Sequence, residues 1–237
     1  MKPIISRTGG KYKLYKKIIP LFPIDYSIYV EPFVGGGSIF FNLEHSDCNI
    51  INDNDTNLIS IYKDVQNDYQ TFEKSVNEVY TKELFNELKK TNQSSSKEYI
   101  LNRISYLGKK NTFHDARKTI RKNFKPYYEK LKDTIILNED YTNVIKNYDS
   151  STTFFYLDPP YENSKKTTSG GYNDINLEEL ANILSNLQGK FLLSLNDSIR
   201  NRGLFKNFNI VEVETKYSIR KDRTTPVIEL IITNYDV

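Results

Sequence analysis

The residue types best suited to chemistry stand together in the motif Asp158-Pro159-Pro160-Tyr161. The apolar run just before them, 154–157, predicts a buried strand with no polar face. Neither proline can donate to a sheet, and the residue before a proline is pushed into an extended conformation. The strand must therefore end with the Asp158 carboxylate and the next carbonyls held rigidly. Such acceptors beside an aromatic ring suit a planar group that donates from an amine, although a stiff turn alone would also explain the motif.

A second candidate site is the glycine-rich loop Glu31-Pro32-Phe33-Val34-Gly35-Gly36-Gly37-Ser38. It follows a predicted strand at 26–30 and precedes a predicted helix at 38–43. This order is typical of nucleotide-binding folds, because glycine lets a ligand approach the backbone closely. A dinucleotide pyrophosphate would need a third glycine where Phe40 stands, and Glu31 would repel phosphate but pair with an ammonium group. Because both flanks are strongly patterned, a flexible linker is the weaker interpretation.

Acidic residues follow two further predicted strands. Strand 48–52 ends in Asp53-Asn54-Asp55, and strand 134–137 ends in Asn138-Glu139-Asp140-Tyr141. An acid at the tip of the second strand is placed to accept hydrogen bonds from ribose hydroxyls. The sequence separation of Asp140 and Asp158 favours neighbouring strands for these two acids. Near the N-terminus, Arg7-Thr8-Gly9-Gly10-Lys11 forms a glycine turn that leads into a predicted helix.

These candidate residues need one edge of a sheet to bring them together. After the Asp158 motif, the pattern predicts a helix at 176–187 and a strand at 190–195, which continues the alternation of strands and helices. The last two strands, 210–217 and 227–233, predict an antiparallel hairpin. We therefore expect a mostly parallel α/β sheet closed by that hairpin, with ligands bound at the carboxyl ends of its strands.

Residues 66–133 interrupt the alternation with polar, helical sequence, so we expect a catalytic domain of 1–65 and 134–237 and an inserted helical subdomain at 66–133. Within the insert, residues 97–131 carry ten Lys/Arg against three Asp/Glu, whereas the whole chain has a net charge of +3. A basic block interleaved with aromatics favours contact with nucleic acid, although a solvated helix face is the alternative. The candidate contacts are Tyr106, Lys109, Lys110, Arg117, Lys118 and Arg121 in the insert, and Arg220, Lys221 and Arg223 between the last two strands.

Composition excludes several other classes. The 237 residues are 27% charged and 38% hydrophobic, which is ordinary for a globular protein. The sequence shows no apolar run long enough to cross a bilayer and no secretory leader. Cys48 is the single cysteine, and His45 and His114 are the two histidines, so we expect no disulfide and no metal site. This cysteine usage favours the reducing cytoplasm.

These pieces, in this order, resemble the Dam-like DNA adenine-N6 methyltransferases, which use S-adenosylmethionine. The resemblance covers nearly the whole chain and extends to the closing segment 223–235. It implies a Rossmann-like methyltransferase sheet, duplex DNA as the partner, no metal, and a bacterial, phage or viral origin. The motifs that carry it are Gly9-Gly10-Lys11, Glu31 to Ser38, Asp53, Asp140-Tyr141 and Asp158 to Tyr161.

The resemblance also implies roles for particular residues. Asp158 and the Pro159 carbonyl would accept the two hydrogens of an adenine amine, and Tyr161 would stack on a base flipped out of the duplex. The insert would recognise the target sequence, with Tyr106 wedged into the duplex. The implied catalytic residues are Asp158, Pro159, Pro160 and Tyr161. The implied cofactor-binding residues are Arg7, Gly9, Gly10, Lys11, Glu31, Pro32, Phe33, Gly35, Gly37, Ser38, Asp53, Asn54, Asp140, Tyr141 and Asp158.

Some alternatives stay open at this point. Aspartate before the prolines favours adenine in this family, whereas serine goes with cytosine-N4 transfer, and Cys48 lies in the wrong place for a carbon-5 enzyme. The insert diverges after Gly108 from relatives that read GATC, so that recognition sequence is only a first guess. Two rival hypotheses are an enzyme that acts on RNA or single-stranded DNA and a silent DNA-binding partner subunit. A nucleotide-dependent oxidoreductase is disfavoured by Phe40 and Glu31. The oligomeric state, monomer or homodimer, is also open, as is a role in restriction-modification.

Overall fold

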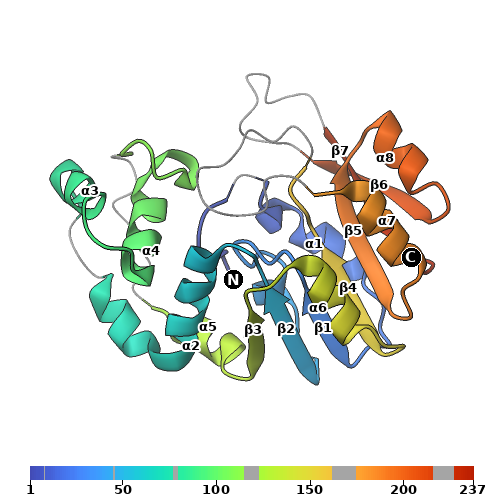
Figure 1. Ribbon diagram of the computed structural model, residues 1–237, viewed down its shortest axis with the longest axis horizontal. Coiled ribbons are helices and arrows are strands. Elements are labelled where there is room, and N and C mark those ends of the chain that lie inside the picture. The colour runs from blue at the N-terminus through green and yellow to red at the C-terminus, as the bar shows by residue number, and fades with distance from the viewer. Residues whose placement is uncertain (8, 45, 77–79, 115–122, 162–174, 216–226) are drawn as a thin grey trace.

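A computed structural model describes residues 1–7, 9–44, 46–76, 80–114, 123–161, 175–215 and 227–237. Within these residues the chain forms a seven-stranded sheet with the strand order β3-β2-β1-β4-β5-β7-β6 (Figure 1). The strands are β1 (Ile28–Glu31), β2 (Cys48–Asn52), β3 (Thr134–Leu137), β4 (Thr153–Leu157), β5 (Lys190–Asn196), β6 (Asn209–Thr215) and β7 (Val227–Thr233). β1 to β5 pair in parallel, and β7 runs antiparallel to both β5 and β6. The predicted α/β sheet with its closing hairpin is confirmed.

The strand order places two loops side by side at the carboxyl edge of the sheet. β1 and β4 are neighbours, and the order of the strands reverses between them. In open α/β sheets this switch point leaves a crevice where ligands bind. The glycine-rich loop leaves β1 and the Asp158 motif leaves β4, so both candidate sites lie at that switch point. The expectation that the strands before Asp140 and Asp158 are neighbours is wrong, because β2 and β1 lie between β3 and β4.

Side chains from the sheet alternate between two apolar layers. Along β4, Phe154 and Tyr156 belong to one buried cluster, and Phe155 and Leu157 belong to the other. This is the two-residue period of a strand that is covered on both faces. One layer contains α6 (Tyr141–Tyr148), α7 (Leu177–Ser185) and α8 (Ile199–Leu204). The other contains α1 (Tyr15–Ile18), α2 (Thr56–Ser75) and α5 (Lys125–Leu131).

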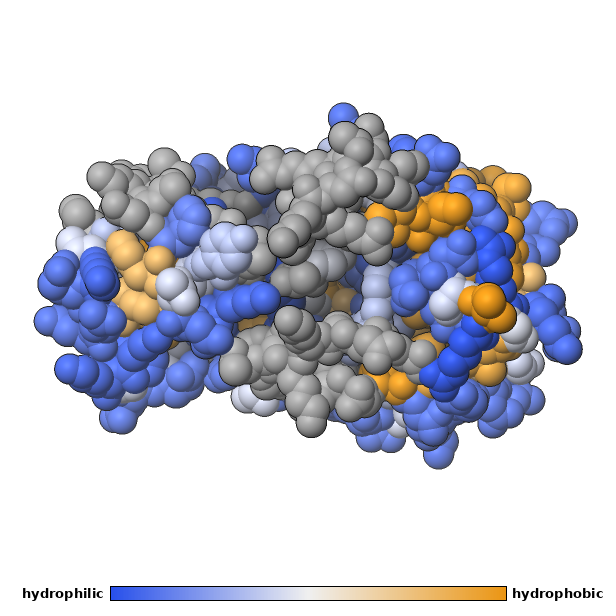
Figure 2. Space-filling model, turned by 90° about the horizontal axis from the view of Figure 1, so that it is seen from above, coloured by the Kyte–Doolittle hydropathy of each residue, from blue (hydrophilic) through white to orange (hydrophobic). Residues whose placement is uncertain are grey.

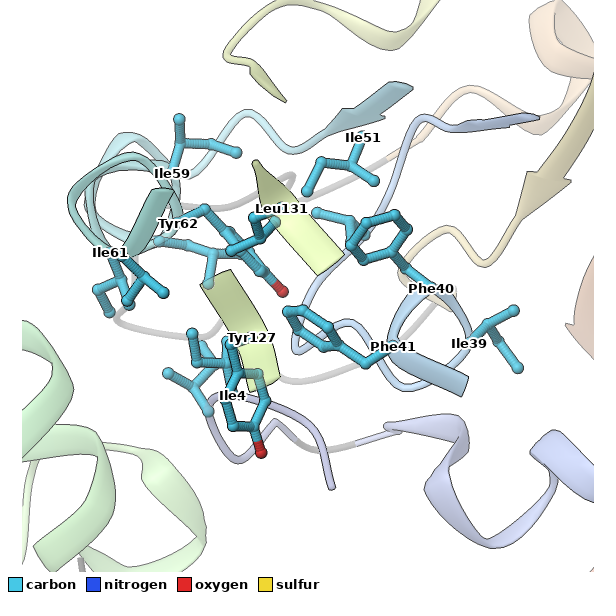
Figure 3. Close-up of a cluster of buried hydrophobic side chains, with 14 of the residues drawn as sticks. Ile4, Ile39, Phe40, Phe41, Ile51, Ile59, Ile61, Tyr62, Tyr127 and Leu131 are labelled. Carbon is cyan, nitrogen blue, oxygen red and sulfur yellow. The ribbon is translucent and has the colours of Figure 1, made fainter. Parts of the chain in front are cut away.

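The predicted helix at 38–43 is wrong, because the structure has only one tight turn, η3 (Phe40–Asn42). Its N-cap residue, Ile39, has no side-chain acceptor for the exposed backbone N–H groups. The turn instead directs both phenylalanine rings into the core. Figure 3 shows Phe40 and Phe41 packed among Ile4, Ile51, Tyr62, Tyr127 and Leu131, which come from the N-terminal segment, β2, α2 and α5.

The described part of the insert packs on the second half of α2. That helix continues past the expected boundary at 66 and has one non-helical residue, Asp68. α3 (Lys82–Leu88), α4 (Ser95–Ile104) and η4 (Tyr106–Gly108) follow. Phe72 of α2 meets Tyr99 of α4 with ring centroids 5.7 Å apart, and both rings belong to the same buried cluster as the N-terminal core. The division into two domains stays a prediction.

The Asn102 amide is one of several side chains that join the insert to the N-terminal segment, together with Arg103 and Tyr127. Asn102 of α4 accepts from Ser6 N at 2.9 Å, donates to Ser6 O at 2.9 Å and donates to Gly108 O at 3.1 Å. Gly108 has φ +73°, and a Cβ there would lie 2.3 Å from Ser6 O. The close approach of these two backbones therefore requires glycine at position 108.

None of the helices that the structure describes is both long enough and apolar enough to span a membrane. The described helices cover the sheet or belong to the insert. The closing turn of the last two strands and the segment after Tyr161 lie outside the described residues.

Replacing Gly108 with alanine should test the junction between the insert and the N-terminal segment. The Cβ would collide with Ser6 O, so we expect Gly108→Ala to lower the free energy of unfolding by about 1–3 kcal/mol in a urea titration. Gly203→Ala in α8 is the matched control, because its Cβ meets nothing within 4 Å and alanine favours the helix. A Gly108→Ala variant as stable as the Gly203→Ala variant would contradict this account.

Candidate active site

The centre of the site is one buried cation between two carboxylates. The Lys11 side chain is 2% exposed, and its Nζ lies 2.6 Å from Asp158 Oδ1 and 3.2 Å from Glu229 Oε1. The same ammonium donates to Gly9 O at 3.2 Å and lies 4.8 Å from the centre of the Tyr161 ring. The structure thus brings the N-terminal glycine turn and the Asp158 motif together, as expected. Lys11 contacts the Asp158 motif directly.

Glu229 is the residue of this cluster that sequence reasoning missed. It lies on β7 and is 0% exposed, and its Oε1 also accepts from Ser194 Oγ at 2.8 Å and from the Tyr161 hydroxyl. Burial raises the pKa of Glu229 to about 7, and Lys11 opposes this shift. A lone charge in the apolar strand Val-Ile-Glu-Leu-Ile-Ile-Thr was the available signal, because such a charge is rarely buried without a partner.

Glu31 forms a second acidic position at the end of β1. Its carboxylate is buried and accepts from the Tyr29 hydroxyl at 2.6 Å. Burial raises the pKa of Glu31 well above its usual value, and the nearby Asp158 raises it further. None of the ion pairs among the described residues includes Glu31. A cationic ligand beside Glu31 would remove the cost of burying this charge.

Tyr156, on the neighbouring strand β4, adds a polar atom without a partner. Its hydroxyl is buried and has no hydrogen-bond partner among the described residues. Burial raises the pKa of Tyr156, and the negative charge of Asp158 contributes to the same shift. The acidic end of β1 and β4 therefore has both a carboxylate and a hydroxyl that a polar ligand can satisfy.

Asp53 organises the glycine-rich loop from the end of β2. Its two carboxylate oxygens accept from Gly35 N and from Asp55 N, each at 3.0 Å. Arg7 NH1 lies 3.7 Å from Asp53, and the same guanidinium forms an ion pair with Asp55. Burial raises the pKa of Asp53, whereas Arg7 lowers it. Arg7, expected as a cofactor-binding residue, is thus held by the two acids at this strand end.

Glycine is required at position 37 of the loop. The residue has φ +71°, and a Cβ there would lie 2.6 Å from the Phe41 ring and 2.9 Å from the Tyr62 hydroxyl. That hydroxyl donates to Gly35 O at 2.8 Å, so the loop lies directly on α2. Ser38, the last residue of the loop, is buried.

A second amide joins the glycine-rich loop to the chain that follows β3. Asn52 donates to Pro32 O and to Glu139 O, each at 3.0 Å, and accepts from Glu139 N at 2.9 Å. This places the rings of Phe33 and Tyr141 5.2 Å apart, side by side across the two loops.

Two other expected cofactor residues differ in their surroundings. Asp140 is exposed and caps α6 by accepting from Thr142 N at 2.9 Å. The side-chain oxygen of Asn54 is buried and has no hydrogen-bond partner in the part of the chain that the structure describes. The Asn54 amide is therefore better placed than Asp140 to gain a hydrogen bond from a ligand.

The expected nucleic-acid contacts divide into three groups. Tyr106 is 54% exposed and stacks on His114 with ring centroids 5.7 Å apart, and Lys109 is also exposed. Lys110 is instead tied to Glu98 by an ion pair. Seen from above, hydrophilic side chains cover most of the described surface at the end formed by α3 and α4 (Figure 2). Arg117, Lys118, Arg121, Arg220, Lys221 and Arg223 lie outside the described residues.

The sheet and the motifs at its switch point define a Rossmann-like methyltransferase. The family model of the D12 class N6 adenine-specific DNA methyltransferases matches residues 8–122 and 106–219, and the chain belongs to this family. It is therefore an adenine-specific DNA methyltransferase, a class of enzyme that uses S-adenosylmethionine.

Three named relatives are similar over nearly the full length. A type II methyltransferase, M.CviBI, from Paramecium bursaria Chlorella virus NC1A is 28% identical, with 93% of this chain and 92% of the relative covered. The type II methyltransferase M1.LlaDCHI from Lactococcus lactis subsp. cremoris is 26% identical, with 99% and 96% covered. The DNA adenine methylase of Escherichia coli K12 is 25% identical, with 94% and 91% covered.

The burial of Glu31 should be measurable as a pH-dependent loss of stability. A carboxyl group whose pKa is raised by folding costs nothing below its unfolded value of 4.5, and its cost grows as the pH rises above that value. Without cofactor, we expect Glu31→Gln to be more stable than the unchanged protein at pH 8, by about 1–3 kcal/mol.

Chemical denaturation of both proteins from acid to alkaline pH checks this expectation. The advantage of Glu31→Gln should disappear as the pH approaches 4.5. Glu44→Gln, at an exposed position, controls for the loss of one negative charge. An advantage that stays constant with pH would show that ionisation of Glu31 is not its cause.

Proposed function

We propose that this enzyme transfers a methyl group from S-adenosylmethionine to the N6 amine of an adenine flipped out of duplex DNA, with Asp158 as the residue that receives the amine. The observation that carries this proposal is that two carboxylates stand at the ends of two adjacent strands at the switch point. Asp158 follows β4 and is 20% exposed, and Glu31 ends the adjacent strand β1 and is buried. One carboxylate suits the amine of the base and the other suits the ammonium group of the cofactor.

The residues around the crevice fit S-adenosylmethionine part by part. Glu31 and the unpartnered Tyr156 hydroxyl support binding of the methionine ammonium and carboxylate end. Asp53, with the buried oxygen of Asn54, supports contact with the ribose hydroxyls. The rings of Phe33 and Tyr141 offer apolar surface to the adenine of the cofactor. When bound, the cofactor supplies an electrophilic methyl group on a sulfonium.

Asp158 has two tasks in this proposal. The lone pair of the adenine amine is delocalised into the ring, so the free amine is a poor nucleophile. By accepting one N–H on Asp158 and the other on the Pro159 carbonyl, the site turns that lone pair toward the methyl group. Asp158 would also take the proton that the amine nitrogen loses when it receives the methyl group. Pro160 and Tyr161 complete the pocket, with the tyrosine ring stacked on the base.

The insert supplies the DNA contacts in this proposal. Tyr106 and Lys109 are exposed on the same turn, so an aromatic ring and a cation are available together. Two relatives that are named type II methyltransferases support a role beside a restriction nuclease.

Removing the Asp158 carboxylate tests the central assignment. We expect Asp158→Ala to lower the single-turnover rate of methyl transfer by about 10²–10³-fold, the scale for one positioned polar group. Binding of S-adenosylmethionine, followed by calorimetry, should change far less. Glu212→Gln, an exposed substitution on β6, is the control. Near-normal turnover by Asp158→Ala would refute the proposed mechanism.

The same assay separates the rival substrates. The unchanged enzyme is offered duplex DNA, single-stranded DNA and RNA of one adenine-containing sequence library, with labelled cofactor. Faster transfer to the duplex supports the proposal, and faster transfer to either other polymer overturns its substrate. Absence of transfer to all three would favour a silent DNA-binding subunit.

The lysines after η4 predict two different effects on DNA binding. Lys109→Gln should weaken duplex binding equally for all sequences and reduce the slope of log K against log salt by about 0.9, because one phosphate contact is lost. Lys110→Gln should leave that slope unchanged, because its ammonium pairs with Glu98. Fluorescence anisotropy at several salt concentrations measures both slopes. Equal slopes for the two variants would contradict the assignment of Lys109 to a phosphate.

A further inference from the structure

The two carboxylates around Lys11 differ in what they can reach. The Asp158 side chain is 20% exposed, whereas the Glu229 side chain is 0% exposed. Substrate can therefore touch only the first of the two. The mechanism proposed above uses Asp158, Tyr161 and their pocket, and leaves Glu229 without a task.

Proton transfer to Asp158 would remove one counter-ion of the buried Lys11 ammonium, and Glu229 is the other carboxylate beside it. Once Asp158 is neutral, the buried Lys11 ammonium loses the carboxylate that lies 2.6 Å away. A buried charge without a counter-ion is strongly unfavourable, so protonation of Asp158 would be opposed. Glu229 Oε1 lies 3.2 Å from the same nitrogen, close enough to form an ion pair with it.

We propose that Glu229 is a positioning residue that takes over as the counter-ion of Lys11 when Asp158 accepts the proton of the methylated amine. This inference rests on the proposed function. In the step, the adenine nitrogen gains the methyl group, the sulfur keeps the electron pair of the broken C–S bond, and the N–H proton moves to an Asp158 oxygen. Lys11 stays protonated throughout: both carboxylates pair with it before the step, and Glu229 alone balances its charge afterwards.

The hydrogen-bond donors around Glu229 oppose the burial that raises its pKa. Its Oε1 accepts from Ser194 Oγ on β5 and from the Tyr161 hydroxyl, in addition to the contact with Lys11. Three donors on one oxygen favour the charged form. The described titratable groups that face Glu229 are Lys11 from the N-terminal turn, Asp158 and Tyr161 from the loop after β4, and Tyr156 from β4 itself.

Glu229 also connects the hairpin to the Asp158 motif. β7 pairs with β5 with Glu229 opposite Asn196, and the carboxylate then reaches across to Tyr161. The same oxygen thus fixes the ring of Tyr161 and the ammonium of Lys11.

Glu229→Gln tests the inference, because glutamine keeps the shape and an acceptor but cannot carry the negative charge. We expect the single-turnover rate at saturating cofactor and duplex DNA to fall by about tenfold or more, less than the range for direct proton transfer. The affinity for S-adenosylmethionine should stay within about twofold, about 0.4 kcal/mol. Glu229→Asp keeps the charge and should recover part of the rate, and Glu212→Gln on β6 is the matched control.

The pH profile gives a readout that a purely structural role would not move. In the unchanged enzyme the rate should rise as Glu229 ionises near pH 7, and Glu229→Gln should lack this limb. Ser194→Ala removes one donor to the carboxylate and should move the limb to higher pH. This second variant decides the matter if circular dichroism shows that Glu229→Gln is unfolded.

Two outcomes separate this inference from the function on which it rests. A normal rate and a normal pH limb in Glu229→Gln, or a limb that Ser194→Ala does not move, overturn the role of Glu229. If Asp158→Ala is inactive in the same assay, the proposed mechanism still stands. If Asp158→Ala is active as well, the proposed mechanism fails first.

Discussion

The structure depends most on the burial of two carboxylates, Asp158 and Glu229, close together at one edge of the sheet. Lys11 is the cation that makes this possible, because it lies between Asp158 and Glu229 and donates to Gly9 in the same turn. Without it, two carboxylates would be forced together in a poorly solvated space. The N-terminal turn is therefore part of the candidate site, although it stands far from Asp158 in the chain.

Much of the fold and of the site could be predicted from short-range patterns. The bounds of β2, β3 and β7 agree with the expected ranges, because each is an apolar run that ends in polar residues. The motif Asp158 to Tyr161 marked the end of β4 from the sequence, because two prolines have few structural uses after a buried strand. The order of the strands and the contact of Glu229 with Lys11 could not be predicted, since both depend on how distant segments meet.

Asparagine amides hold the loops that the site requires. Asn52 bridges the glycine-rich loop and the chain after β3, and Asn102 bridges the insert and the N-terminal segment. An amide both donates and accepts, so it can replace a pair of strand-like backbone bonds where no strand can form. Buried backbone groups in these loops are satisfied in this way without a charge. The sequence alone does not mark Asn52 and Asn102 as bridging residues, because asparagine is also common in turns.

The contacts of Asn102 bear on how far the sequence at this junction can vary. Its bonds to Ser6 and Gly108 use only main-chain atoms of those two residues. These three bonds therefore do not depend on which side chain stands at position 6, whereas position 108 needs glycine for the close approach of the two backbones. Tyr127, which donates to Lys2 O at 3.0 Å, is a further link between the insert and the N-terminal segment, and this link does depend on a side chain. Sequence change at position 6 is thus compatible with keeping α4 attached to the segment that leads to Lys11.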